Sequence, residues 1–122
     1  MTQPTILMQC RLPDAQDKQL EQLGTVHRAL GLEDKEALYA TIKDDVTVIA
    51  TTAGVTCDGS LMAKFPNLKL VANLGVGYDA IETSYAAANG ITVTNTPDVL
   101  TDEVADTALG LLLMTVRELP QA

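Results

Sequence analysis

The amino-acid sequence predicts an α/β fold in which helices cover both faces of a parallel sheet. Short apolar runs alternate five times with segments of helical spacing, and Gly or Pro residues separate most of them. The 122 residues have the length of a single domain, and 47% of them are hydrophobic, enough for a buried core. Because the chain has no Trp and one Phe, we expect a core of Leu, Ile, Val and Ala.

Five apolar runs are the expected strands. They are short and mostly apolar, as is typical of strands with both faces buried. Residues 46–52, Val-Thr-Val-Ile-Ala-Thr-Thr, are rich in β-branched residues and are the clearest case. The expected strands cover residues 5–11, 25–30, 46–52, 68–74 and 91–94.

The segments that alternate with these strands are the expected helices. Gly24 and Asn89-Gly90 are natural helix ends, and Asp58 is placed to cap a short helix that stops before Pro66. The other expected helices cover residues 14–23, 33–43, about 81–88 and about 101–119. These alternations predict a flavodoxin-like, doubly wound, five-stranded parallel sheet with strand order 2-1-3-4-5 in a three-layer αβα arrangement. We expect residues 1–122 to form this single domain.

The last helix is the longest and the most apolar. Thr101 is a favourable N-cap, and the two residues after it are acidic, as the helix dipole favours. From Val104 to Val116, apolar residues lie on nearly every side of the helix. We expect such a helix to be buried on more than one side, and the small sheet to cover only one of them.

Composition argues against several classes of function. A net charge of −8 disfavours binding to nucleic acid or to an anionic membrane surface, since both need clustered Lys and Arg. Cys10 and Cys57 belong to no Cys-x-x-Cys pair, so we expect reduced thiols in a cytoplasmic protein. We expect no signal peptide and no metal site. The longest apolar stretch, residues 109–114, is far shorter than the ~20 residues that span a bilayer.

Gly75-Val76-Gly77-Tyr78-Asp79-Ala80 follows the fourth expected strand and matches the G-x-G-x-x-(G/A) pattern of dinucleotide-binding loops. Three features argue against a dinucleotide site. The next helix is short, the next strand ends without an Asp or Glu for a ribose hydroxyl, and too little chain follows to complete a nucleotide-binding sheet. Two interpretations of the glycines remain: a nest of backbone N–H groups for a small carboxylate, or a tight turn that needs positive φ.

The sequence around this motif resembles a known family. Leu-Lys-Leu-Val-Ala-Asn-Leu-Gly-Val-Gly-Tyr-Asp at residues 68–79, the run at residues 87–106 with its Asn-Thr-Pro-Asp-Val-Leu-Thr-Asp-Glu-Val, and the apolar helix to Arg117 carry the resemblance. They are similar to D-isomer-specific 2-hydroxyacid dehydrogenases, particularly the glyoxylate/hydroxypyruvate reductase branch. The resemblance is strong over residues 68–119 and looser over residues 1–67. Asp79-Ala80-Ile81-Glu82 differs by one conservative change from the family's usual Asp-x-Ile-Asp.

The resemblance implies a substrate domain with a defined binding loop. In such enzymes the backbone amides matching Val76 and Gly77, next to Gly75, hold the substrate carboxylate. The loop matching the residues around Ala53 lies beside the substrate. It also leaves the carboxyl end of a strand, where open sheets place their ligands.

Other implications concern parts of the enzyme beyond these loops. Thr101 matches a position that touches the cofactor from the substrate-domain side. The helix over about 101–119 resembles one that leads into a nucleotide-binding domain and packs in a homodimer. The family's catalytic Arg, Glu and His, and its cofactor fingerprint, would follow the last residue of this sequence. His27 and Arg28 match no catalytic position, so we expect no catalytic residue in the chain.

Two hypotheses for the function follow. The first is the substrate-domain portion of an NAD(P)-dependent oxidoreductase that interconverts 2-keto acids, such as glyoxylate or hydroxypyruvate, and D-2-hydroxy acids. The chain alone is then expected to be inactive and to bind neither NAD nor NADP tightly. The second is a stand-alone, non-enzymatic domain that binds a small acid or dimerises through its apolar helix. An electron carrier or receiver is disfavoured, because the loop at Leu12-Pro13-Asp14 has no Ser/Thr/Gly-rich cradle for a phosphate.

Overall fold

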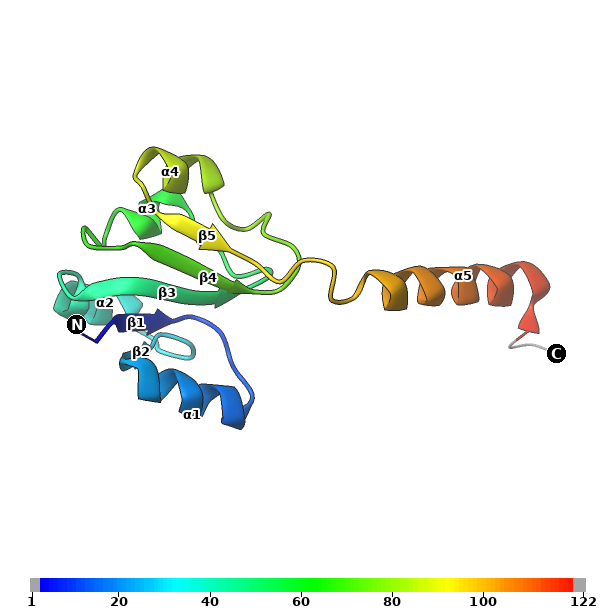
Figure 1. The fold of residues 1–122 in the computed structure, drawn as a ribbon, viewed down its shortest axis with the longest axis horizontal. Coiled ribbons are helices and arrows are strands. Elements are labelled where there is room, and N and C mark those ends of the chain that lie inside the picture. Colours follow the sequence, from blue (N-terminus) through cyan, green and yellow to red (C-terminus); the bar gives the residue numbers. More distant parts are fainter. Residues whose placement is uncertain (1–2, 120–122) are drawn as a thin grey trace.

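Five parallel strands form one sheet in the computed structural model, which describes residues 3–119 (Figure 1). Their order is β2-β1-β3-β4-β5, which confirms the predicted fold class and strand order. The strands are β1 (Thr5–Met8), β2 (Thr25–Arg28), β3 (Val46–Thr52), β4 (Leu70–Leu74) and β5 (Thr92–Thr94). The helices are α1 (Asp14–Leu23), α2 (Lys35–Ile42), α3 (Gly59–Met62), α4 (Thr83–Ala88) and α5 (Thr101–Arg117).

Side chains that alternate along the strands build two cores. Leu7 and Val71 point to one face of the sheet, where they pack with residues of α2, α3 and α4 around the buried Phe65. Met8 points to the other face and packs in a smaller cluster with Leu20 of α1. The sheet therefore lies between helices, and of the described helices only α1 contributes to the core on the second face.

Element boundaries differ from the predicted ones by up to three residues. β3 and α1 have the predicted bounds, whereas the strand expected over residues 5–11 ends at Met8. The last ladder bonds run from the Ala29 N–H to the Met8 carbonyl (2.9 Å) and from the Gln9 N–H to the Ala50 carbonyl (2.9 Å). The chain then leaves the sheet and reaches α1, whose N-cap is Pro13.

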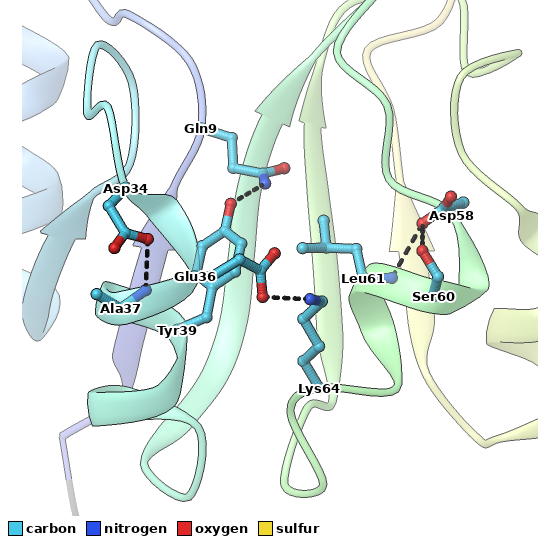
Figure 2. Close-up of polar contacts among 9 residues, drawn as sticks. All are labelled: Gln9, Asp34, Glu36, Ala37, Tyr39, Asp58, Ser60, Leu61 and Lys64. Atoms are coloured by element: carbon cyan, nitrogen blue, oxygen red, sulfur yellow. Dashed lines mark hydrogen bonds and ion pairs between the residues drawn. The ribbon is translucent and has the colours of Figure 1, made fainter.

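Side-chain caps fix the start of two helices (Figure 2). Asp58 accepts hydrogen bonds from the Leu61 N–H (2.9 Å) and the Ser60 Oγ (2.8 Å), which confirms the predicted cap of α3. These bonds lower the pKa of the Asp58 carboxyl. Asp34 accepts from the Ala37 N–H (2.9 Å) at the start of α2. Both carboxylates lie at the positive end of a helix dipole, which stabilises them further.

Gly24 ends α1 as predicted, but for a reason other than positive φ. Its backbone is extended, with φ −179°. A Cβ at this position would lie 2.0 Å from the Pro4 carbonyl oxygen, which accepts a hydrogen bond from the Thr25 N–H (3.1 Å). Glycine is required because the chain passes against the residue before β1 as it enters β2.

α5 extends away from the sheet, and this corrects two predictions (Figure 1). We expected the sheet to cover one side of the helix, but none of its residues is buried. The N-cap is Leu100 rather than Thr101, which is the first helical residue, and no side chain caps the helix. The connecting turn, with Asp98 at φ 62°, directs the chain away from the sheet before the helix begins.

A row of polar side chains crosses the sheet near its carboxyl edge. Thr51 pairs with Asn73 across β3 and β4, and the bond from the Gln9 N–H to the Ala50 carbonyl places Gln9 beside Thr51. All three side chains are buried, and Gln9 donates to the Tyr39 hydroxyl at 3.2 Å (Figure 2). The row separates the apolar core from the loops that leave this edge of the sheet.

Candidate functional site

Three segments meet at the carboxyl ends of β3, β4 and β5. In open α/β sheets this edge is where ligands bind. Residues 75–78, called the glycine loop below, follow β4, and residues 53–55 follow β3. Asn95 directly follows β5. The glycine loop leaves the strand between the other two and is the candidate site.

Two asparagines hold the carbonyl groups of the glycine loop. Asn73 donates from Nδ2 to the Gly75 carbonyl (3.1 Å) and to the Gly77 carbonyl (2.9 Å). Asn95 donates from Nδ2 to the Val76 carbonyl (2.9 Å). The three successive carbonyls therefore accept hydrogen bonds from the domain's own side chains.

These bonds turn the following N–H groups outward. The C=O and N–H of a trans peptide point in opposite directions, so each held carbonyl aims the next N–H away from its asparagine. The N–H groups of Val76, Gly77 and Tyr78 donate no hydrogen bond to any residue between 3 and 119, and the three residues are exposed. Successive unpaired N–H groups form a nest for an anion. The geometry supports the anion-nest interpretation of the motif.

The two glycines of the loop have different structural roles. Gly75 has φ +158°, and a Cβ there would lie 3.2 Å from the Ala53 Cβ and 3.4 Å from the Ala53 N. Gly75 therefore permits the close approach of the loop that follows β3. Gly77 has no positive φ, and a Cβ there would make an ordinary 3.5 Å contact with Asp79 Oδ2. The alternative of a tight turn that needs positive φ is wrong for Gly77.

The far end of the glycine loop is fastened to the domain. The Ile81 N–H donates to the Tyr78 carbonyl (2.9 Å) and closes a turn over residues 78–81. Cys57 then bridges to Ile81, through bonds from the Cys57 N–H to the Ala80 carbonyl (2.8 Å) and from the Glu82 N–H to the Cys57 carbonyl (3.1 Å). Burial raises the pKa of the Cys57 thiol to about 11, so the thiol is protonated at neutral pH and contributes packing.

The residues that follow the motif do not fit a dinucleotide. A pyrophosphate site needs a helix that begins directly after the glycines, with its first N–H groups facing the phosphates. Here the turn over residues 78–81 intervenes, α4 has six residues, and its N-cap is the acidic Glu82. The motif therefore lacks the geometry of a dinucleotide fingerprint.

Two open hollows lie along this edge of the sheet. The one beside the glycine loop has a volume of about 370 Å³ and is lined by Tyr78, Thr83, Val93, Thr94 and Asn95. The other, of about 430 Å³, lies over the ends of β1 and β2 and includes Arg28. Arg28 forms ion pairs with Asp17 (2.9 Å) and Glu21 (2.6 Å), so its positive charge is already compensated. Of the glycine loop, Tyr78 is the residue that lines the first hollow.

The structure brings together four of the five predicted site residues. Gly75, Val76 and Gly77 form the glycine loop, and Ala53 lies against Gly75. Thr101 does not join them, because it begins α5 beyond the turn at residues 97–100. His27 is half-buried in β2, which β1 and β3 separate from β4.

Residues 3–119 contain no group of three or more His, Cys, Asp or Glu side chains that could hold a metal ion. Within the same range, no helix has the length and apolar character needed to cross a membrane. Cys10 and Cys57 are both buried, free thiols.

Asn73 and Asn95 were not predicted as site residues, although the sequence contains a signal for Asn73. Val71 and Asn73 share the inward face of β4, so a polar residue takes a core position two residues before Gly75. Asn95 gives no such signal, because Asn is common in the turns that follow strands. Its bond to the glycine loop spans 19 residues of sequence and is visible only in the fold.

Comparisons with known proteins identify the family. Residues 6–116 match the family described as D-isomer specific 2-hydroxyacid dehydrogenase, catalytic domain. The chain is 35% identical over 114 residues to the glyoxylate/hydroxypyruvate reductase A of Arabidopsis thaliana. That match covers 93% of this chain and 36% of the plant protein.

Solved structures show the same fold and the same partial coverage. The 2-hydroxyacid dehydrogenase of Ketogulonicigenium vulgare Y25 has a TM-score of 0.89 and 38% identity, over 100% of this chain and 38% of that one. The NADPH-dependent glyoxylate/hydroxypyruvate reductase of Sinorhizobium meliloti, in complex with NADP and malonate, has a TM-score of 0.80 and 45% identity, over 99% of this chain and 37% of that one. This chain therefore spans little more than a third of the length of these relatives.

The fold and these similarities define a portion of an oxidoreductase. The chain belongs to the D-isomer specific 2-hydroxyacid dehydrogenase family and corresponds to the N-terminal portion of its catalytic domain. The resemblance expected from the motifs is confirmed. It also extends into residues 1–67, where no motif is diagnostic.

Proposed function

We propose that this chain is the front part of the substrate domain of an NAD(P)-dependent enzyme that interconverts 2-keto acids and D-2-hydroxy acids. Glyoxylate and hydroxypyruvate are the keto acids we expect it to use. The observation that carries the proposal is the nest formed by the outward N–H groups of Val76 and Gly77. Each N–H donates a charge-assisted hydrogen bond to the substrate carboxylate. Bound in this way, the acid presents its keto carbon away from the loop.

Two structures of a relative support a small acid as the ligand. The Sinorhizobium meliloti reductase has been solved with malonate and with citrate. In the present chain, Asp79 lies close to the nest, with its Oδ2 3.5 Å from the position of a Cβ on Gly77. This carboxylate and the net charge of −8 oppose a bound anion. We therefore expect the chain alone to bind a keto acid weakly, with a Kd on the order of millimolar.

The remaining parts of the enzyme are assigned to a nucleotide-binding domain beyond residue 122. In this proposal α5 leads into that domain, and Thr101 touches the cofactor from the substrate-domain side. The bound NAD or NADP supplies the hydride, and the second domain supplies the catalytic Arg, Glu and His. Residues 1–122 hold and orient the acid, with Ala53 forming the wall beside Gly75. The two buried, free thiols fit a reducing compartment such as the cytoplasm.

The proposal is tested by two assays of cofactor oxidation with glyoxylate and hydroxypyruvate. The first uses the 122-residue chain with NADH and NADPH, and no turnover is expected. The second uses a chimera in which residues 1–117 replace the matching part of the Sinorhizobium meliloti reductase, to which the chain is 45% identical. Turnover by the chimera is expected. A folded but inert chimera would refute the proposal, and turnover by the chain alone would place the chemistry within residues 1–122.

A homodimer through α5 is a second part of the proposal. Leu109, Leu112 and Val116 lie along one side of the helix and are 56%, 58% and 68% exposed. Apolar surfaces of this kind are normally covered by a partner. Sedimentation of the chain is expected to show a dimer, and Leu112→Asp a monomer. A wild-type monomer at high concentration would contradict this interface. A dimer that binds glyoxylate, combined with an inert chimera, would favour the stand-alone binding domain instead.

A further inference from the structure

We propose that Asn73 and Asn95 are positioning residues that aim the N–H groups of the glycine loop at the acid. The inference rests on the proposed carboxylate site and assigns the shape of that site to two side chains outside it. A backbone nest binds an anion only while its N–H groups converge. Because exposed loops are mobile, the loop needs contacts that keep this arrangement when no acid is bound.

Asn95 controls the direction of the Gly77 N–H. Its Nδ2 donates to the Val76 carbonyl at 2.9 Å from a position directly after β5. The Val76 carbonyl and the Gly77 N–H belong to one peptide plane, so fixing the first fixes the second. Asn95 also lines the hollow beside the loop, together with Tyr78. The end of β5 is in this way linked to the loop that follows β4.

Asn73 controls two further peptide planes. Both N–H groups of its side-chain amide are used, one on the Gly75 carbonyl (3.1 Å) and one on the Gly77 carbonyl (2.9 Å). The first bond, together with the bond that the Thr96 N–H donates to the same Gly75 carbonyl at 3.0 Å, aims the Val76 N–H, and the second aims the Tyr78 N–H. The nest therefore has a third aimed donor at Tyr78, one residue beyond the two amides that the family resemblance implies.

The choice of asparagine at position 73 is explained by the loop. An amide nitrogen supplies two donors, whereas Asp supplies none when ionised and Ser supplies one on a shorter side chain. Asn73 is 4% exposed and shares the inward face of β4 with Val71, where a polar side chain costs stability unless it is hydrogen-bonded. The Asn73 Oδ1 has no hydrogen-bond partner among residues 3–119. Within that range, the hydrogen bonds of the Asn73 side chain are therefore the two that its Nδ2 donates to the loop. An apolar residue would suit the core better.

Glyoxylate titration of the ¹⁵N-labelled 122-residue chain tests the inference, with the loop amides as reporters. Wild type is expected to show saturable shifts at Val76, Gly77 and Tyr78. Asn95→Ala is expected to raise the Kd about fivefold or more, the loss of one ordinary hydrogen bond, and Asn73→Ala, which removes two bonds, by at least as much. Both variants are expected to lower the ¹H–¹⁵N NOE of the loop. Asn95→Gln keeps a donor at this half-buried position and is expected to bind within about twofold of wild type.

Asn67→Ala is the matched control. The Asn67 Nδ2 donates to the Asp44 carbonyl at 2.8 Å, so this variant also removes a bond from an asparagine to a carbonyl, but before β4, at the opposite end of the strand from the loop. It is expected to bind glyoxylate like the wild type. Circular dichroism checks the fold of every variant. If the variant at the buried position 73 unfolds, the variants at position 95 still decide the outcome.

The results distinguish the positioning role from the function on which it rests. Wild-type binding that is weakened in Asn95→Ala and retained in Asn95→Gln supports the inference. Wild-type binding with both alanine variants within about twofold overturns the positioning role and leaves the carboxylate site in place. No saturable shift in the wild type removes the carboxylate site, and the positioning role with it.

Discussion

Alanine substitutions at Gly75 and at Gly77 are expected to differ in their effect on stability, because the two glycines of this loop have different neighbours. A Cβ on Gly75 would lie 3.2 Å from the Ala53 Cβ and 3.4 Å from its N, on a backbone with φ +158°. Crowding of this kind costs about 1–3 kcal/mol, and the unusual backbone conformation adds about 1–3 kcal/mol. Partial relaxation of the loop at Ala53 makes about 2–4 kcal/mol the expected loss of stability. For a domain of this size that lowers Tm by roughly 10 °C.

Gly77→Ala is the matched control, because its Cβ would meet only Asp79 Oδ2 at 3.5 Å, an ordinary contact. Its stability is expected to lie within about 1 kcal/mol of wild type, since the loss of chain entropy in the unfolded state offsets small costs. Urea unfolding followed by far-UV circular dichroism measures both variants. Equal midpoints for the two would refute the claim that Gly75 is required by the approach of the loop after β3.

Three further predictions concern the rest of the domain. Gly24→Ala would place a Cβ 2.0 Å from the Pro4 carbonyl oxygen, so we expect a loss of about 2 kcal/mol or more in urea unfolding, and an unchanged midpoint would contradict the packing described for Gly24. Thr51→Val replaces a fully buried hydroxyl that has no partner among residues 3–119, so it is expected to leave stability unchanged or to raise it by about 1 kcal/mol; a loss of similar size would show that the hydroxyl is bonded. Cys57 has a pKa of about 11 in the fold against 9.0 for a free thiol, so between these values the unfolded chain releases a proton that the folded chain keeps. Stability is therefore expected to fall as pH rises through this window, and to fall less in Cys57→Ala.

Periodicity predicted the fold because nearly every element is short and bounded by a clear signal. The β-branched run at residues 46–52 and the polar helix before Gly24 have the predicted bounds. Where a strand end depends on its neighbours, periodicity was insufficient. Residues 9–11, Gln-Cys-Arg, carry no Gly or Pro to mark the end of β1, and the paired strand β2 ends at Arg28. Boundaries of this kind are set by pairing and cannot be read from one segment alone.

The candidate site was only partly predictable. Strand-end glycines marked the loop, because ligands bind at the carboxyl edge of parallel sheets. The contacts that shape the loop join residues distant in sequence, such as Asn95 to Val76 and Ala53 to Gly75, and no local pattern contains them. Thr101 shows that a local pattern can also give a wrong prediction. Thr is a residue type that favours the N-cap position, but the turn that precedes Thr101 makes Leu100 the N-cap of α5.

Glyoxylate and its neutral methyl ester provide the most direct test of the central claim, that the glycine loop binds the carboxylate of a keto acid. The two compounds differ in charge and share the keto-acid skeleton, so the comparison isolates the carboxylate. We predict that glyoxylate shifts the backbone amide signals of Val76 and Gly77 in a saturable way, and that the ester at the same concentrations leaves them in place. Equal shifts with both compounds, or shifts confined to residues outside the loop, would contradict the account.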